Sequence, residues 1–242
     1  MKYYSIHPSS NRKIIGHYPQ QKDSVINGNV NSPIFIGNLF LKTIDFDPVV
    51  PHTVLHDKSN LTDLLATTGQ GYSFTLTLSD MLKNIIEQNA NTEDFQFFKS
   101  DIIQNKNILA SYWLLHPIKE RLEIIDYNNS EIFIADFVNL EQLDLKNHLE
   151  FETELEKLKR EGYKGQSGSF FLEFERMQIK DYIDRDIFYA RYRRGCAFYV
   201  SKRLKEIIEA EGCTGIEFIP TDMSYNEWMN PGGYKESVYG YV

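Results

Sequence analysis

The chain has 242 residues, of which 42% are hydrophobic and 14% aromatic, and it carries a formal net charge of -8 with a pI near 5.3. This composition supports a packed core and excludes a disordered or collagen-like chain. The acidic balance argues against nonspecific binding to nucleic acid, whose phosphates attract basic surfaces. The N-terminus lacks the apolar run of a signal peptide, and no window reaches the roughly 18 apolar residues of a membrane span, so we expect a cytoplasmic protein.

The first quarter of the chain predicts short extended pieces separated by polar loops. Residues 3–6 predict one short strand. Residues 34–36 and 39–41 predict strand fragments on either side of a turn at Gly37 and Asn38. Residues 61–66 predict a single helical turn.

Two similar segments, residues 79–87 and 201–209, have the same residue at six of nine positions. Each begins with a serine, which can accept hydrogen bonds from the unpaired N–H groups of a first helical turn. In the second segment Leu204, Ile207 and Ile208 fall on one helical face. Apolar runs precede and follow both segments. The sequence therefore predicts two related strand-helix-strand units.

Charged and extended segments alternate in the rest of the chain. In order, we expect a strand buried on both faces at 108–115, a hairpin formed by 122–127 and 131–135, a charged helix at 140–161, strands at 169–175 and 187–192, and a tail at 225–242 that is a tethered loop or a last strand. These elements predict an α+β fold with a mixed or mainly antiparallel sheet. The chain reads as one domain, which can be divided into lobes of about 1–138 and 165–242 joined by the charged helix.

No sequence motif predicts a catalytic centre, a cofactor site or a metal site. The sequence contains neither a nucleophile elbow nor a phosphate-binding loop, and it has no dinucleotide-binding glycine pattern and no zinc-binding helix. His52 and His56 have a four-residue spacing, but they lie in a proline-flanked segment without a carboxylate cluster. The two cysteines, Cys196 and Cys213, predict buried reduced thiols rather than a disulfide framework.

Two segments are candidates for contact with a protein partner. The first is an alternating acidic run: Glu150, Glu152, Glu154 and Glu156. On a helix these carboxylates spread over two faces, where they form either a solvated surface or an electronegative patch that steers a basic partner. The second is the aromatic tail, with Tyr225, Trp228 and Tyr234, which either anchors an interface or folds back onto the core.

Several of these segments together resemble a known family. Residues 198–209, followed by 212–218 with the pattern Gly-Cys-Thr-Gly-Ile-Glu-Phe, resemble the C-terminal signature of a bacterial immunity-protein family of polymorphic-toxin loci, the myxobacterial type. Residues 112–127 with Ser130 look like the middle block of that family, and residues 187–188 like the strand before its last block. The resemblance covers roughly residues 72–220.

The resemblance implies an immunity protein, an antidote that is not an enzyme and that binds a cognate, basic protein toxin and occludes it. It implies no cofactor, nucleic acid or membrane partner. Two other classes stay open. One is an enzyme with an unrecognised polar pocket around His52, His116 and Asp126, and the other is a self-associating scaffold module with an exposed apolar surface.

Overall fold

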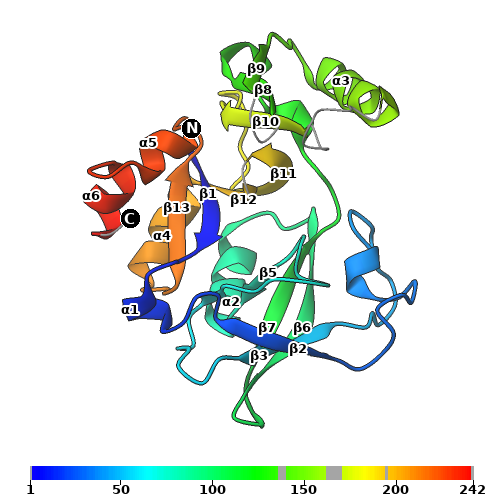
Figure 1. Ribbon diagram of the computed structural model, residues 1–242, viewed down its shortest axis with the longest axis vertical. Helices are drawn as coiled ribbons and strands as arrows, with labels where there is room; N and C mark the ends of the chain where they lie inside the picture. The colour runs from blue at the N-terminus through cyan, green and yellow to red at the C-terminus, as the bar shows by residue number, and fades with distance from the viewer. Residues whose placement is uncertain (1, 136–139, 162–170, 194–195, 241–242) are drawn as a thin grey trace.

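The computed structural model describes residues 2–135, 140–161, 171–193 and 196–240 of the chain. Over these ranges the protein has three mainly antiparallel β-sheets and six α-helices (Figure 1). The α+β class and the dominance of antiparallel pairing confirm the coarse prediction from the sequence. None of the described helices is long and apolar enough to cross a membrane.

The largest sheet has six strands and forms the lower part of the molecule in Figure 1. In spatial order these are β2 (Gln21–Ile26), β3 (Pro51–Leu55), β6 (Phe95–Gln104), β7 (Asn107–Pro117), β5 (Leu76–Leu78) and β4 (Leu64–Leu65). Neighbours are antiparallel except β3 and β6, which run parallel. The β6–β7 hairpin turns at Asn105 and Lys106, whose positive φ angles of 51° and 66° suit a two-residue turn.

The second sheet has the first strand of the chain in its interior. In spatial order its strands are β11 (Ile187–Arg193), β12 (Cys196–Ser201), β1 (Tyr3–Pro8) and β13 (Ile216–Pro220). Tyr4 lies opposite Val200 on one side and Pro220 on the other. The strand predicted at 3–6 is confirmed, and a division of the chain into lobes 1–138 and 165–242 would separate this strand from its sheet.

The third sheet lies at the top of Figure 1 beside the longest helix. It consists of β10 (Phe171–Arg176), β8 (Glu131–Ala135) and β9 (Leu140–Leu143), and the helix is α3 (His148–Glu161). The rings of Phe151 and Phe174 stack with centroids 5.2 Å apart. Their core cluster also contains Tyr3 and Phe188 from the second sheet, so the third sheet and the second share one core.

Helices α2 (Asp80–Asn89) and α4 (Lys202–Ala210) form where the two similar segments predicted them. Ser79 Oγ accepts a hydrogen bond from Leu82 N, and Ser201 Oγ accepts one from Leu204 N, as N-cap side chains do. The two helices pack against each other over a common apolar core to which both sheets contribute. This core joins the first sheet to the second.

The strands around these helices are arranged alike in the two sheets. The first strand group consists of β5, β6 and β7: α2 connects β5 to β6, and β7 lies between these two strands in the sheet. The second strand group consists of β12, β13 and β1: α4 connects β12 to β13, and β1 lies between them. The registers also agree, because Trp113 lies opposite Leu78 as Tyr4 lies opposite Val200. The two central strands read Tyr-Trp-Leu-Leu-His-Pro and Tyr-Tyr-Ser-Ile-His-Pro. The central strand of the second group precedes the whole first group along the chain.

Several sequence-based predictions of local structure were wrong. Residues 122–127 do not form a hairpin with 131–135; they contain the 3-10 helices η2 (Leu122–Ile124) and η3 (Tyr127–Asn129), and β8 pairs with β9 and β10 instead. Residues 140–143 form β9, so the charged helix begins only at residue 148. Residues 61–66 contain the strand β4 in place of a helical turn. Residues 140–143 take their structure from pairing with β8, and residues 64–65 from pairing with β5, so in both segments strand pairing overrides the local helical pattern.

Other segments differ from expectation in burial or type. Ile108 and Leu109 of β7 are 67% and 44% exposed, so that strand is not buried on both faces along its whole length. Residues 36–38 form the 3-10 helix η1 (Ile36–Asn38). The tail forms α5 (Tyr225–Met229) and α6 (Tyr234–Tyr239). A further short helix, α1 (Arg12–Ile15), follows β1.

Candidate functional site

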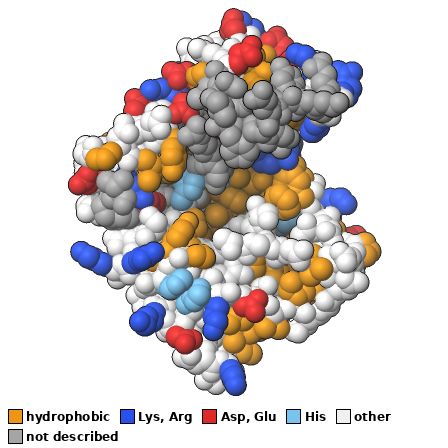
Figure 2. Space-filling view, viewed as in Figure 1, with side chains coloured by type: hydrophobic (Ala, Val, Ile, Leu, Met, Phe, Trp, Pro, Cys, Tyr) orange, Lys and Arg blue, Asp and Glu red, His pale blue; other side chains and the backbone are white. Residues whose placement is uncertain are grey.

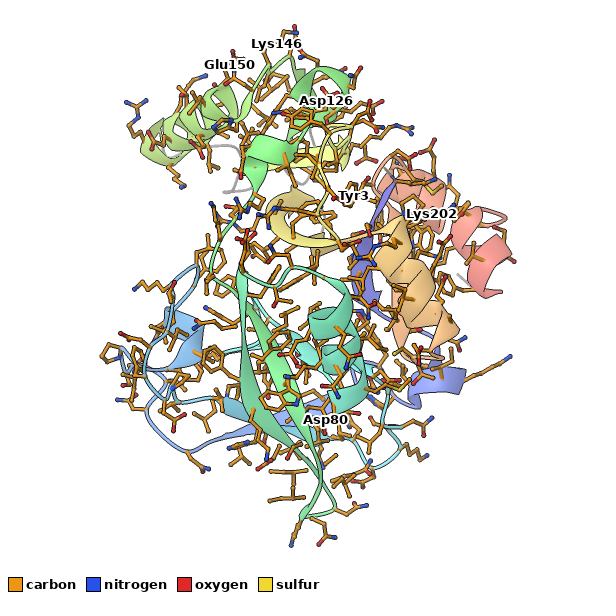
Figure 3. All side chains as sticks on the ribbon, turned by 180° about the vertical axis from the view of Figure 1, so that it is seen from behind. Tyr3, Asp80, Asp126, Lys146, Glu150 and Lys202 are labelled. Carbon is orange, nitrogen blue, oxygen red and sulfur yellow. The ribbon has the colours of Figure 1, made fainter. Side chains whose placement is uncertain are left out.

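The outer face of α3 carries the predicted acidic run. The helix starts after Asn147, whose side-chain oxygen accepts hydrogen bonds from Leu149 N and Glu150 N. Its inner face is anchored by Phe151 and Leu158, which are 0% and 6% exposed. Figure 3 shows Lys146 and Glu150 at the outer end of the molecule, far from Asp80 at the start of α2.

The four glutamates of this run have different surroundings. Glu150 accepts hydrogen bonds from Lys146 N and the Asn147 side chain, and Glu154 accepts one from Lys157 Nζ at 2.8 Å. The carboxylates of Glu152 and Glu156 form no ion pair within the described parts of the chain. With Leu149, which is 62% exposed, they occupy positions i, i+3 and i+7 of the helix and share one face. We call Leu149, Glu152 and Glu156 the α3 face.

The aromatic tail folds back onto the edge of the second sheet. Trp228 is 1% exposed and packs against the rings of Tyr234 and Tyr239, at 5.8 and 5.9 Å. The Tyr239 hydroxyl accepts a hydrogen bond from Phe218 N, on the outer edge of β13. Tyr225 and Tyr234 are each 41% exposed. Of the three tail candidates, two therefore present surface to solvent, while Trp228 holds the tail in place.

The tail is also fixed by an ion pair with β10. Glu227 completes a capping box with Ser224 and accepts two hydrogen bonds from Arg176, at 2.7 and 2.9 Å. The hydrogen bonds from the Arg176 guanidinium, followed by those from Ser224, lower the pKa of Glu227 to about 2. This carboxylate is therefore charged over the physiological range.

The residues considered for an enzyme do not meet in one place. His52 lies on β3 and its Nδ1 accepts a hydrogen bond from Asp101 N. His116 lies on β7, is 1% exposed, and donates from Nε2 to the Lys42 carbonyl at 3.3 Å; burial lowers its pKa. Asp126 lies beside the third sheet, where it accepts from the Asn129 side chain. Within the described ranges, no three His, Cys, Asp or Glu side chains gather as a metal site requires.

The cysteines are placed on either side of α4. Cys213 is partly buried, and burial raises the pKa of its thiol to about 12, so the reactive thiolate is not formed near neutral pH. Cys196 begins β12, and its side chain lies outside the described part of the structure.

A buried carboxylate that the sequence did not single out joins distant segments. Asp94, whose side chain is 3% exposed, accepts two hydrogen bonds from Arg121 at 2.6 Å and one from Arg185 at 2.9 Å. The hydrogen bond to Asp94 raises the pKa of Arg121. No local signal marks this cluster, because its members are far apart in sequence. Its place between the strand groups indicates a structural role.

A pocket of about 350 Å³ opens beside the common core. The space-filling view in Figure 2 shows hydrophobic side chains exposed in a hollow at the waist of the molecule. The apolar lining of the pocket includes Ile6, Leu65, Tyr72, Leu76 and Phe198, and its hydroxyl groups come from Thr67, Thr68, Ser73 and Thr75. His7 and Pro8 complete one end, and among the described residues no Lys, Arg, Asp or Glu lines the pocket.

No protein-family model matches the chain, and no curated protein matches it.

Proposed function

We propose that this chain is an immunity-type protein that binds a cognate bacterial protein toxin and neutralises it by covering its surface. The observation that carries the proposal is the α3 face. There the exposed Leu149 shares one helix face with the carboxylates of Glu152 and Glu156, and the helix is anchored by Phe151 and Leu158. An exposed apolar side chain beside two carboxylates fits a basic partner, since the charges guide the encounter and the leucine adds buried area.

The proposal includes an internal organisation of two related strand-helix-strand units. It is supported by matching contacts outside the caps. Lys83 lies over the Trp113 and Phe97 rings, and Lys205 lies over the Tyr4 and Phe218 rings. Each of these lysines also pairs with a glutamate one turn later, Glu87 and Glu209. A rigid pair of units sharing one core would present surface helices without rearrangement on binding.

The first test is co-expression of the tagged chain with the product of the adjacent toxin gene. We expect the two proteins to copurify and the host cell to survive a toxin that otherwise kills it. Copurification without rescue would argue for a binding module that is not an antidote. Absence of both a complex and rescue would overturn the proposal.

Charge reversal tests the α3 face itself. We expect the double variant Glu152→Lys, Glu156→Lys to bind the toxin with an association rate lowered roughly ten-fold at low salt, and with a smaller effect at high salt. The rate is measured by stopped-flow or surface plasmon resonance. Glu206→Lys on α4 is a single-site control, since this carboxylate is also exposed on a helix and only pairs with Lys202 one turn away. Equal rates for all three proteins would exclude the α3 face as the contact.

A further inference from the structure

The first 22 residues carry a charge opposite to that of the whole chain. They contain four Lys and Arg residues and no Asp or Glu, although the chain has 34 Asp and Glu against 26 Lys and Arg. Three of these cations come together in the fold, because α1 and the start of β2 lie beside the loop that follows β3. We call the basic side chains gathered there the basic surface: Arg12, Lys13, His17, Lys22, His56 and Lys58.

Close contacts hold the two backbone segments of this surface together. Asn60 N donates to Ile15 O at 2.9 Å, and the Asn60 carbonyl accepts from the Gln20 side chain at 2.7 Å. No side chain fits at Gly16, because its Cβ would lie 1.9 Å from the Lys58 carbonyl oxygen. The basic side chains therefore project from a backbone that is already fixed, and a ligand need not order it on binding.

The lysine and arginine side chains of the basic surface are exposed. Within the described ranges, none of the four forms an ion pair. The acidic residues next to them in sequence are Asp23, whose carboxylate accepts a hydrogen bond from Ser24 N at 2.8 Å, and Asp57. Four like charges without a bonded counter-ion attract an anionic group from solution, and added salt weakens that attraction.

Two histidines give this surface a charge that depends on pH. The His17 and His56 rings stack with centroids 3.7 Å apart, and His17 Nδ1 donates to Pro19 O at 2.8 Å. Burial, followed by the charges of His17 and Lys22, lowers the pKa of His56, while the Asp57 carboxylate acts in the opposite direction. Figure 2 shows histidine side chains at the surface below the hollow, with Lys and Arg side chains beside them. An anion bound here would favour the protonated rings.

The surroundings of the basic surface favour a peptide ligand over a nucleic acid. Ile14 and Tyr18 lie in the same segment and are 41% and 49% exposed. A peptide can cover them with apolar side chains while its carboxylates meet the cations. A nucleic acid would extend past the surface into the field of a chain whose net charge is -8, which repels a long polyanion.

We propose that the basic surface binds a carboxylate-rich segment of a protein partner, and that it binds this segment more tightly when the His17 and His56 rings are protonated. Protonation and carboxylate binding strengthen each other, because linkage between two binding events is reciprocal. The surface lies far from α3 in Figure 1 and its charge is opposite to that of the α3 face. This contact is therefore distinct from the one proposed for the toxin.

The probe is acetylated hexaglutamate, titrated at low salt into the full-length ¹⁵N-labelled chain. We expect chemical-shift changes at the amides of His17, Lys22 and Lys58, and loss of binding at high salt. A thymidine oligonucleotide with six phosphates is the comparison, and it should bind more weakly than the peptide. No shift at these amides, or tighter binding of the oligonucleotide, would overturn the proposal.

Charge reversal locates the binding site. The double variant Lys22→Glu, Lys58→Glu should bind hexaglutamate at least about ten-fold more weakly at low salt, because two cations that attract the peptide become repulsive. The matched control Lys119→Glu, Lys159→Glu changes the net charge equally at exposed positions outside the basic surface, and it should bind nearly as the wild type does. Equal weakening in both double variants would show that only net charge matters and would contradict the proposed site.

A change of pH tests the role of the two rings. The wild type should bind hexaglutamate roughly two- to four-fold more tightly near pH 6 than near pH 7.5, because the bound anion stabilises the protonated rings. In ring-proton spectra the peptide should raise the pKa of His56. The double variant His17→Gln, His56→Gln should bind with nearly equal affinity at both pH values. Equal affinity at both pH values in the wild type, or the full increase in the double variant, would overturn the proposed coupling.

Discussion

At the residue scale, the buried carboxylate of Asp94 links the segment before β6 to Arg121 after β7 and to Arg185 before β11. We expect Asp94→Asn to lower the free energy of unfolding by about 2–3 kcal/mol, because two guanidinium groups lose their charged partner. Glu93→Gln is the matched control. Glu93 contacts the same two arginines but its side chain is 52% exposed, so solvent screens its ion pairs and its loss should be clearly smaller than that of Asp94→Asn. Urea denaturation measures the free energy of unfolding of both variants. Equal losses of stability in the two variants would contradict the structural role assigned to Asp94.

Glu227 predicts how the tail responds to acid. Its pKa is lowered from 4.5 to about 2 in the folded chain, so the stability it contributes is present above pH 4.5 and is lost as the pH falls toward 2. We expect the wild type to be more stable than Glu227→Gln near pH 6, with the difference shrinking across this window. The fluorescence of Trp228, buried in the tail, is the local readout in a Trp113→Phe background. If the stability difference between the wild type and Glu227→Gln does not change with pH, the charge of the Glu227 carboxylate is not the cause of that difference.

At the element scale, α2 and α4 begin with the same kind of N-cap, a serine whose side chain accepts a hydrogen bond from the first helical turn. Ser79 and Ser201 each accept from a helix amide, and each donates to an aspartate, Asp63 at 2.6 Å and Asp186 at 2.5 Å. Ser79→Ala and Ser201→Ala should each cost about 1 kcal/mol of stability, with the greater loss at Ser201, which is 0% exposed. Thermal and urea unfolding test this order. A greater loss of stability in Ser79→Ala than in Ser201→Ala would mean that burial of the serine does not determine how much stability is lost.

Elements defined by local signals are the ones that the sequence predicts well. Ser79 and Ser201 cap their helices through neighbours three residues away, and the apolar periodicity of Leu204 and Ile208 is also local. The start of α3 at residue 148 was missed because residues 140–143 satisfy their backbone in a strand ladder with β8. The spread of the glutamates over two helix faces was predictable, but the exposure of Leu149 was not. The pocket could not be derived at all, since it depends on which strands become neighbours.

At the scale of the whole molecule, the second strand group is completed from the far end of the chain, because its central strand β1 precedes the whole first group in sequence. We expect fragments 1–105 and 106–242, divided at the tip of the β6–β7 hairpin, to associate when co-expressed and to be unfolded when expressed alone. Gel filtration and circular dichroism report both outcomes. Ile6→Pro in the first fragment should prevent association, since it disrupts the ladder between β1 and β13. A folded 106–242 fragment would contradict this arrangement.

The central position of β1 also has a consequence for the order in which a ribosome makes the protein. The partners of this strand, β12 and β13, are synthesised only near the end of the chain. At about 5–20 residues per second, the strand waits roughly 10–40 s after its own synthesis before both neighbours exist. During that time Tyr3, Tyr4 and Ile6 have no native surface to cover them. These apolar side chains thus stay uncovered until the final strands to emerge complete the sheet around the first.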